Sequence, residues 1–412
     1  MIRRNVLLAL FLALCSAGVY SQNTLGFKLP DNVNRVNIPF ESYNNLLVIP
    51  VILNGVLPLK FVLDTGVRTT ILTEKAFSDI LNLNYEKHIV VSGIGGEKLV
   101  DAYITNGVSL ELPGMKGEGH TMLVLDKDYI ELSNYLGTQV HGILGYEIFS
   151  RVIVKINFTK KTLSLIKPEK FKKKRKFRSV PITIEDTKPY INVQITQRDG
   201  KRTPMKLMID SGASHGLLLE STADSTVVVP DNTITSNIGR GLGGDLIGQI
   251  ARVNKLELGE FEFNEVIATY PDPNSYMDSL KMGSTFRHGT LGGGVLSRFT
   301  VIFDYSSEML YLKKNAAYKK PFEYNMSGIV IKATGKNLRR FKIEEVREGS
   351  SAMKAGIQAG DFILSVNHNS VDRLPLQQVI GMFNARANKT LRVELEREGK
   401  LVFKKFKLER QI

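Results

Sequence analysis

Cysteine is almost absent from this sequence: the 412 residues contain one, Cys15, which lies in an apolar stretch near the start. If that stretch is removed as a leader, the remaining chain has no disulfide bond and no cysteine nucleophile. His-Glu-x-x-His and cysteine pairs, which are typical of zinc sites, are missing as well. No later run is long and apolar enough to span a membrane. The sequence therefore predicts no metal and no cofactor, and it argues against cysteine or zinc chemistry.

The first residues have the pattern of a secretory signal. Arg3 and Arg4 form a basic start, and an apolar core of about a dozen residues runs from Val6 to Ala17. This core is too short for a transmembrane helix, so residues 1–21 are predicted to be a signal cut after Ser21. The mature protein is then exported, either periplasmic or secreted.

Cys15 supports a second interpretation, in which it is a lipid attachment site. A large residue, Leu14, precedes it where a lipid attachment motif usually has a small one, so this interpretation is less favoured. Residues 22–45, which follow the signal, are weakly patterned and are predicted to form an N-terminal arm.

Positive charge is concentrated in one place. The formal net charge is +14, and six cations fall between residues 172 and 178: Lys172, Lys173, Lys174, Arg175, Lys176 and Arg178. Such a run is found in nucleic-acid-binding patches, but it is also typical of a solvated connection. Because few aromatic residues are interleaved, we interpret residues 169–188 as a basic linker between two domains. No nucleic-acid partner is expected, and binding to an anionic surface stays open.

Two halves of the chain repeat each other. Phe61–Gly66 and Leu207–Gly212 are both apolar runs that end in Asp, a hydroxyl residue and Gly. A Gly-rich segment and then an apolar pair followed by Gly come after each of them, and the corresponding landmarks lie 146 to 148 residues apart. A near-constant offset indicates a duplicated domain. Asn54-Gly55 and Asp199-Gly200 lie between apolar runs as in hairpins, so both units, residues 46–168 and 189–315, are predicted to be β-rich.

The two repeated aspartates, Asp64 and Asp210, predict paired carboxylate chemistry. A carboxylate at the end of a buried strand costs free energy unless another group uses or satisfies it. A single such site could be an Asx turn, but two need a common explanation. Two carboxyl groups held close together cannot both ionise easily, so the pair shares a proton and can supply both an acid and a base.

On these motifs, each unit resembles a lobe of the retropepsin-like aspartic proteases. The resemblance covers about residues 46–315. It implies a catalytic pair, Asp64 and Asp210, drawn from both lobes of one monomer with a pseudo-two-fold active site and a polypeptide substrate. It implies that Thr65 and Ser211 lock the two loops together, and that Gly66 and Gly212 let the backbone approach the substrate. It also implies two mobile flaps: Gly93, Ile94, Gly95 and Gly96 in the first, and Gly241, Leu242, Gly243 and Gly244 in the second.

The sequence departs from the family pattern after each catalytic motif. Arg68 follows the first, where it would lower the pKa of Asp64, contact an acidic substrate, or lie in solvent as an edge charge. His215 follows the second, and we interpret it as a structural neighbour.

The last part of the chain, residues 325–410, resembles a bacterial PDZ domain. Its marks are Ala355-Gly356, then Gly360-Asp361 at a tight turn, then an apolar strand that ends in Asn367. The resemblance implies an α+β fold with a sheet edge and a helix that hold a peptide, often by its C-terminal carboxylate. The predicted peptide-binding residues are Ser327, Gly328, Ile329, Ile331, Val379 and Met382.

The expected function is that of an exported aspartic endopeptidase whose PDZ domain recruits a substrate or partner. The alternative is a catalytically inactive protein that binds peptides through its PDZ domain.

Overall fold

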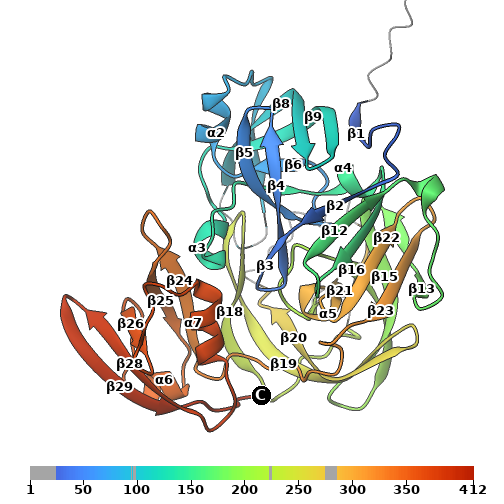
Figure 1. Ribbon diagram of the computed structural model, residues 1–412. Coiled ribbons are helices and arrows are strands. Elements are labelled where there is room, and N and C mark those ends of the chain that lie inside the picture. The colour runs from blue at the N-terminus through green and yellow to red at the C-terminus, as the bar shows by residue number, and fades with distance from the viewer. Residues whose placement is uncertain (1–24, 94, 96–98, 222–224, 274–284) are drawn as a thin grey trace, which may run out of the picture.

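The computed structural model describes residues 25–93, 95, 99–221, 225–273 and 285–412. The predicted signal, Cys15, and the flap residues Ile94 and Gly96 lie outside these residues. Two β-rich lobes form the body of the molecule, and a smaller C-terminal unit stands beside them (Figure 1). Within the described ranges, no helix is long and apolar enough to cross a membrane.

The first lobe is built on a nine-stranded sheet. In spatial order its strands are β1 (Gly26–Lys28), β9 (Met115–Leu125), β6 (Thr70–Leu72), β10 (Gly142–Leu144), β5 (Leu57–Leu63), β4 (Leu46–Leu53), β8 (Leu99–Leu112) and β7 (Lys87–Ser92), and β3 (Glu41–Tyr43) pairs with β4. Its helices are α2 (Lys75–Ile80), α3 (Leu132–Leu136) and α4 (Tyr146–Phe149). Strand β5 is buried at Phe61, Val62 and Leu63, as the apolar run predicts.

The second lobe repeats this arrangement in an eight-stranded sheet. In spatial order its strands are β14 (Thr183–Glu185), β15 (Lys188–Thr196), β16 (Arg202–Ile209), β21 (Gly289–Leu291), β17 (Leu217–Leu219), β20 (Phe261–Pro271), β19 (Gly244–Leu258) and β18 (Ile234–Gly241). Its helix α5 (Gly293–Leu296) has the place of α4. The order β5-β10-β6-β9 in the first lobe corresponds to β16-β21-β17-β20 in the second, which confirms the prediction of two similar β lobes.

A third sheet contains three strands from each lobe. Its order is β13 (Arg178–Pro181), β23 (Met309–Lys314), β22 (Phe299–Asp304), β11 (Ile153–Asn157), β12 (Thr162–Ile166) and β2 (Arg35–Pro39). At its centre β11 and β22 run antiparallel, with Val154 opposite Phe303 and Ile156 opposite Val301. Buried residues of both lobes form one continuous cluster around it, so the lobes share a core.

The repeats begin earlier than the sequence suggests. Within the expected arm and linker, β2 with β3 and β13 with β14 are strands of the two lobes. Their apolar side chains explain this placement, because Ile38 is fully buried and Val180 nearly so. The 3-10 helix η1 (Pro168–Lys170) and the basic run connect the lobes across the shared sheet, where Phe171 and Phe177 pack on its apolar residues.

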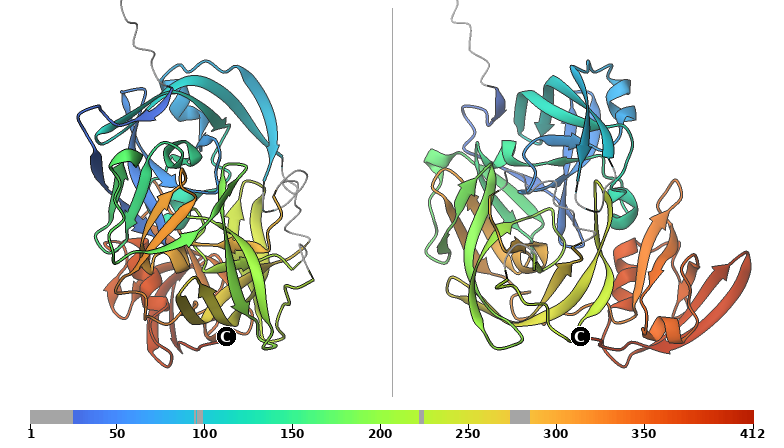
Figure 2. Two further views of the ribbon diagram at one scale, coloured as in Figure 1. Left: turned by 90° about the vertical axis from the view of Figure 1, so that its right-hand side faces the viewer. Right: turned by 180° about the vertical axis from the view of Figure 1, so that it is seen from behind.

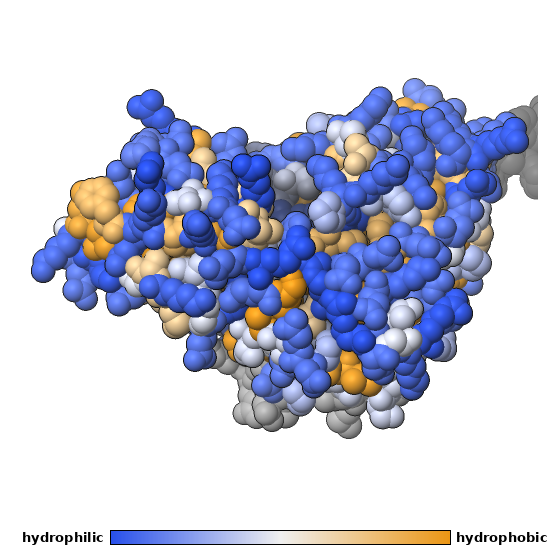
Figure 3. Space-filling model, turned by 90° about the horizontal axis from the view of Figure 1, so that it is seen from below, coloured by the Kyte–Doolittle hydropathy of each residue, from blue (hydrophilic) through white to orange (hydrophobic). Residues whose placement is uncertain are grey.

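The C-terminal unit has its own sheet and its own core. The sheet order is β24 (Ile329–Thr334), β25 (Arg340–Val346), β26 (Phe362–Val366), β28 (Thr390–Arg397) and β29 (Lys400–Lys407), with β27 (Asn369–Ser370) beside β26. Its helices are α6 (Ser351–Lys354) and α7 (Leu376–Phe383). Figure 2 shows this unit beside the second lobe, and in Figure 3 it projects to one side with apolar atoms at its tip. Leu401 and Phe403 on β29 are exposed.

Candidate active site

The two repeated aspartates lie at the ends of equivalent strands, β5 and β16. Strand β5 pairs in parallel with β10 immediately before Asp64, and β16 pairs in parallel with β21 before Asp210. The Asp64 N–H donates to the Leu144 carbonyl over 2.9 Å, and the Asp210 N–H donates to the Leu291 carbonyl over 3.0 Å. Each carboxylate therefore leaves the sheet from the same hydrogen-bonded position.

The loops that follow are locked to each other by buried hydroxyl groups. Thr65 Oγ1 donates to the Ile209 carbonyl over 2.7 Å and accepts the Ser211 N–H over 3.0 Å. In return, Ser211 Oγ donates to the Leu63 carbonyl over 2.9 Å and accepts the Thr65 N–H over 3.1 Å. Because each loop supplies a donor and an acceptor to the other, neither loop can keep this geometry alone.

The lock brings the two carboxyl groups together. Gly66 N–H donates to Asp64 Oδ1 over 2.6 Å, and Gly212 N–H donates to Asp210 Oδ1 over 2.7 Å. Burial raises the pKa of Asp64 well above its usual range, and the charge of Asp210 and a hydrogen bond with it raise it further. The Gly66 N–H and the more distant Lys188 act in the opposite direction. The pair can therefore hold one proton between two carboxyl groups.

Gly66 and Gly212 both allow the two carboxyl groups to lie close together, but a side chain would be tolerated less at Gly212 than at Gly66. A Cβ atom at Gly212 would lie 2.1 Å from Asp64 Oδ2, which no real contact allows. A Cβ atom at Gly66 would lie 3.1 Å from Asp64 Oδ1 and 3.3 Å from Asp210 Oδ2. The first lobe's carboxylate thus leans against the second lobe's backbone, so the two motifs are not interchangeable.

The later glycines of each repeat brace these loops. A Cβ atom at Gly145 would lie 2.0 Å from the Val67 carbonyl oxygen, and one at Gly292 would lie 2.4 Å from the His215 carbonyl oxygen. Tyr146 N–H donates to the same Val67 carbonyl over 2.9 Å. The bracing segments thus hold the chain just beyond each aspartate.

The two predicted flaps meet each other. A Cβ atom at Gly93 would lie 2.4 Å from Leu242 Cβ, and one at Gly95 would lie 2.1 Å from the Gly244 carbonyl oxygen. Leu242 itself packs against an apolar cluster of the first lobe that includes Ile71. The other predicted flap glycines, Gly241 and Gly243, lie in this second flap, Gly241 at the end of β18 and Gly243 in its turn.

The two unusual neighbours of the aspartates do not enter the pair. Arg68 is exposed and forms an ion pair with Asp186 of the other lobe over 3.5 Å, and the cation that lowers the pKa of Asp64 is Lys188. Burial lowers the pKa of His215 to about 4, so its ring is neutral at ordinary pH. Its Nε2 atom has no hydrogen-bond partner among the described residues.

Residues 212–216 also match the Gly-x-Ser-x-Gly pattern of serine hydrolases. That pattern needs a helix after the serine and a base beside its hydroxyl. Here strand β17 follows, and the exposed Ser214 uses its carbonyl to accept a hydrogen bond from Asn45 over 3.0 Å. This segment is therefore an inter-lobe contact.

Sequence reasoning missed one repeated support of the site. His141 Nδ1 accepts the Lys60 N–H over 3.0 Å, and His288 Nδ1 accepts the Lys206 N–H over 3.0 Å. Each histidine directly precedes a landmark Gly, so the repeat spacing could have revealed the pair. Tyr305 was also missed: it lies in the turn directly after β22, where burial first and then the charge of Asp64 raise its pKa.

The predicted peptide-binding residues of the C-terminal unit lie around β24 and α7. Ile329 and Ile331 are on β24, Val379 and Met382 are on α7, and α7 packs against β24. The N–H groups of Ser327 and Gly328, which were predicted to bind a peptide carboxylate, instead donate to Asn325 Oδ1 over 3.1 and 3.0 Å. In this structure the loop therefore satisfies its own donors.

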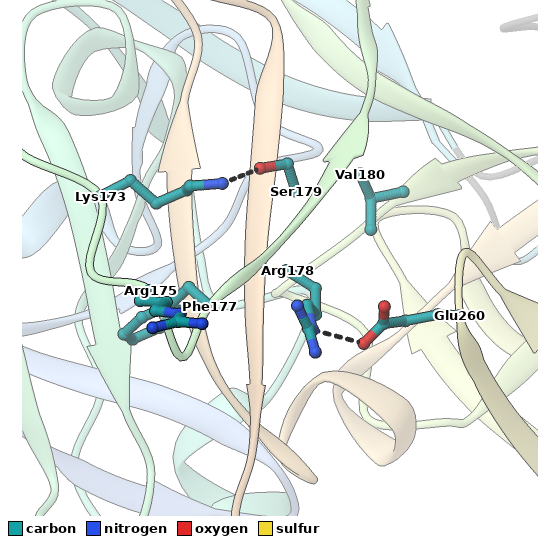
Figure 4. Close-up of a pocket in the computed structure, with 7 residues that line it drawn as sticks. All are labelled: Lys173, Arg175, Phe177, Arg178, Ser179, Val180 and Glu260. Carbon is teal, nitrogen blue, oxygen red and sulfur yellow. Dashed lines mark hydrogen bonds and ion pairs between the residues drawn. The ribbon is translucent and has the colours of Figure 1, made fainter.

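The basic run lies outside the aspartate site. An open depression of about 550 Å³ is lined by Lys173, Arg175, Phe177, Arg178, Ser179, Val180 and Glu260. In Figure 4, Lys173 donates to Ser179 and Arg178 pairs with Glu260, at 2.9 and 2.7 Å. Part of the charge is thus neutralised within the chain. Among the described residues, no group of three or more His, Cys, Asp or Glu could hold a metal ion.

Comparison with known families agrees with this geometry. The aspartyl protease family model matches residues 49–148 and 191–295, so each matched segment contains one of the two aspartates. A PDZ domain model matches residues 342–397. A search of the curated proteins gave no match to the chain.

Proposed function

Because this chain joins two retropepsin-like aspartyl protease segments to a PDZ domain, we propose that it is an aspartic endopeptidase whose Asp64 and Asp210 act as one catalytic pair. The observation that carries this proposal is the reciprocal bonding of Thr65 and Ser211, which holds the two carboxyl groups together. Two carboxyl groups that share one proton serve acid–base chemistry, for which a protein that only binds peptides has no use.

The chemistry follows from the single shared proton. The ionised carboxylate takes a proton from a water molecule as the water oxygen adds to the peptide carbonyl carbon, and the protonated carboxyl gives its proton to the carbonyl oxygen. The tetrahedral intermediate then returns one hydroxyl proton to the pair, the nitrogen receives a proton from the pair, and the C–N bond breaks. The pair ends with one proton, as it began, and no covalent enzyme intermediate is required.

We also propose that one chain forms one complete site. Since each lobe supplies one carboxylate and both lobes share a core, a monomer with a pseudo-two-fold arrangement is sufficient. The signal-like residues 1–21 support export to the periplasm or the medium.

The PDZ domain is proposed to recruit polypeptide substrates, since a peptide can add to the edge of such a sheet. Removing residues from Ser327 onward should slow the cleavage of proteins much more than the cleavage of short peptides. Equal losses for both substrates would show that the domain only braces the second lobe.

The direct test of the enzyme proposal is cleavage of an unfolded protein mixture with and without a statine-type inhibitor. We expect hydrolysis that the inhibitor blocks. Absence of hydrolysis over the range from pH 3 to 8 would favour the alternative, an inactive protein that binds peptides through its PDZ domain.

A further inference from the structure

The free edge of β24 in the PDZ domain is covered by the first protease lobe. On one side β24 pairs with β25, and on the other side α3 lies against it (Figure 1). An edge strand offers unpaired backbone groups that another segment can bind. This is the edge where a PDZ domain adds a peptide.

Three contacts from α3 and its flanking residues fit this edge. Asn134 Nδ2 donates to the Ala333 carbonyl of β24 over 2.8 Å. Lys332 forms an ion pair with Glu131, and only 14% of the lysine side chain is exposed. A Cβ atom at Gly137 would lie 2.4 Å from Leu376 Cβ, so the segment also touches the first residue of α7. The segment therefore meets both walls of the peptide groove.

The carboxylate end of the groove is closed by the chain itself. Asn325 Oδ1 accepts the N–H groups of Ser327 and Gly328, and Asn325 Nδ2 donates to the Ile329 carbonyl over 2.7 Å. A ligand that depends on a free C-terminal carboxylate would have to displace this side chain. An internal segment, which has no terminal carboxylate, meets no such obstacle.

The same segment also holds the second flap. Arg240 Nε donates to the Tyr129 carbonyl over 3.1 Å, and its guanidinium lies 3.2 Å from Glu131 and 2.7 Å from Asp245. Glu131 thus contacts a flap arginine and the PDZ lysine Lys332 at once. The PDZ domain also contacts the flap strand β18 directly, where Ser236 Oγ donates to Glu345 over 3.0 Å.

We propose that residues 129–137 are an internal ligand of the PDZ groove, and that an extended polypeptide segment with an acidic residue opposite Lys332 displaces them and frees the second flap. Among the described residues, the internal ligand makes one hydrogen bond to the β24 backbone, from the Asn134 side chain, whereas an added strand makes several from its own backbone. A tethered ligand has an effective concentration in about the millimolar range, so only a segment that gains those extra bonds competes with it. The proposed effect on the flap rests on the proposed protease function. The proposal that residues 129–137 occupy the PDZ groove does not depend on that function.

Hydrogen exchange of the full-length chain tests this proposal without any need for catalysis. In an Asp210→Asn background, Asn134→Asp places a carboxylate against the Ala333 carbonyl and removes the donor. We expect the backbone amides of residues 329–334 to exchange about tenfold faster, equivalent to losing one good hydrogen bond. Asn232→Asp, at an exposed position of the second lobe, should change nothing.

A second variant and a defined probe complete the test. Lys332→Glu opposes Glu131 and should accelerate the same amides. A synthetic peptide of residues 127–140, added in excess, should slow the exchange again in Asn134→Asp, and a scrambled peptide should not. Unchanged exchange in both variants, or equal protection by the scrambled peptide, would overturn the internal ligand. Absence of hydrolysis by the wild-type protein, measured separately, would overturn only the protease proposal.

Discussion

The two lobes position Asp64 and Asp210 with equivalent strands and hydrogen bonds, yet their flaps cover the site differently. Strand pairing, the Thr65 and Ser211 bonds and the histidine supports are repeated almost atom for atom. The flaps are not repeated in this way. On the first flap Val90 and Leu99 are exposed, whereas on the second Leu242 packs on the first lobe and Arg240 bonds to it.

This difference has a physical cause. Two carboxyl groups that share a proton must keep a fixed separation, so any change in one loop must be matched by the other. A flap has only to cover the site and move, and many contacts satisfy that need. The duplication is therefore preserved at the aspartates, while the second flap has acquired contacts with the first lobe and the PDZ domain.

The largest expected effect is a difference in activity between alanine variants of the two equivalent glycines, Gly212 and Gly66. Gly212→Ala would place a Cβ atom 2.1 Å from Asp64 Oδ2 and displace that carboxylate, so we expect kcat/KM to fall about 100-fold or more. Gly66→Ala meets oxygens at 3.1 and 3.3 Å and should cost about tenfold or less. Peptide hydrolysis by the two folded variants measures this, and equal losses would contradict the asymmetry.

The second prediction concerns the lock between the loops. Thr65→Val keeps the shape but leaves the Ser211 N–H and the Ile209 carbonyl buried without a partner. We expect a loss of about 2–4 kcal/mol in the free energy of unfolding, together with reduced activity. Thr65→Ser keeps the hydroxyl, as Ser211 does in the second lobe, and should be close to wild type in a denaturant titration. A Val variant as stable as the Ser variant would refute the lock.

The third prediction sharpens the comparison of the flaps. Arg240→Ala removes the contacts of the second flap with Tyr129 and Glu131. Because the flap would then close less readily over the substrate, we expect KM for a short peptide to rise about three- to tenfold, with a smaller change in kcat. Arg202→Ala, which removes an exposed arginine paired with Glu257 in the same lobe, is the matched control. Equal kinetics in the two variants would show that the contacts of Arg240 do not help the second flap to close.

The smallest expected effect is on stability and comes from the raised pKa of Asp64. A carboxyl group whose pKa is higher in the folded state binds more protons there, so its contribution to stability is complete below the unfolded pKa and is lost as pH rises through the folded pKa. Asp64→Asn removes this loss and should unfold a few degrees higher than wild type at neutral pH, although it is inactive. Asp31→Asn, at an exposed position, should show no such gain in a thermal melt series. A neutral-pH melting temperature below that of wild type would contradict the raised pKa.

That the two aspartate loops lie together could be predicted from the sequence, because this arrangement depends on the identity of the residues in the two motifs. Asp64 and Asp210 recur at one spacing, and only a hydroxyl residue followed by Gly allows the bonds that the structure contains. His141 and His288 recur at the same spacing, so they could have been predicted from the repeat as well. The lobe boundaries were less accurate, because β2 and β13 are short strands whose burial depends on the shared sheet.

The contacts of the PDZ domain could not be predicted, because no repeat or periodic pattern marks them. Asn134 and Ala333 lie far apart in the chain, and each is an ordinary residue in its own segment. The Asn325 side chain accepts the N–H groups of Ser327 and Gly328, which the resemblance to a PDZ domain would leave for a ligand. A contact made by one side chain leaves no pattern in the sequence. Arg68 is close to Asp64 in sequence, but it bonds across the lobe interface instead.

The central claim is that one chain builds one catalytic pair from both lobes, and mixing two inactive variants tests it most directly. Initial rates of cleavage of an unfolded protein should be measured for wild type, Asp64→Asn, Asp210→Asn and an equal mixture of the two variants, all shown to be folded. The account predicts hydrolysis by wild type and a loss of about 1,000-fold or more for each variant and for the mixture, because an Asn cannot share the proton. Near-normal turnover by either variant would contradict the shared pair, and recovered activity in the mixture would show that the pair forms between chains.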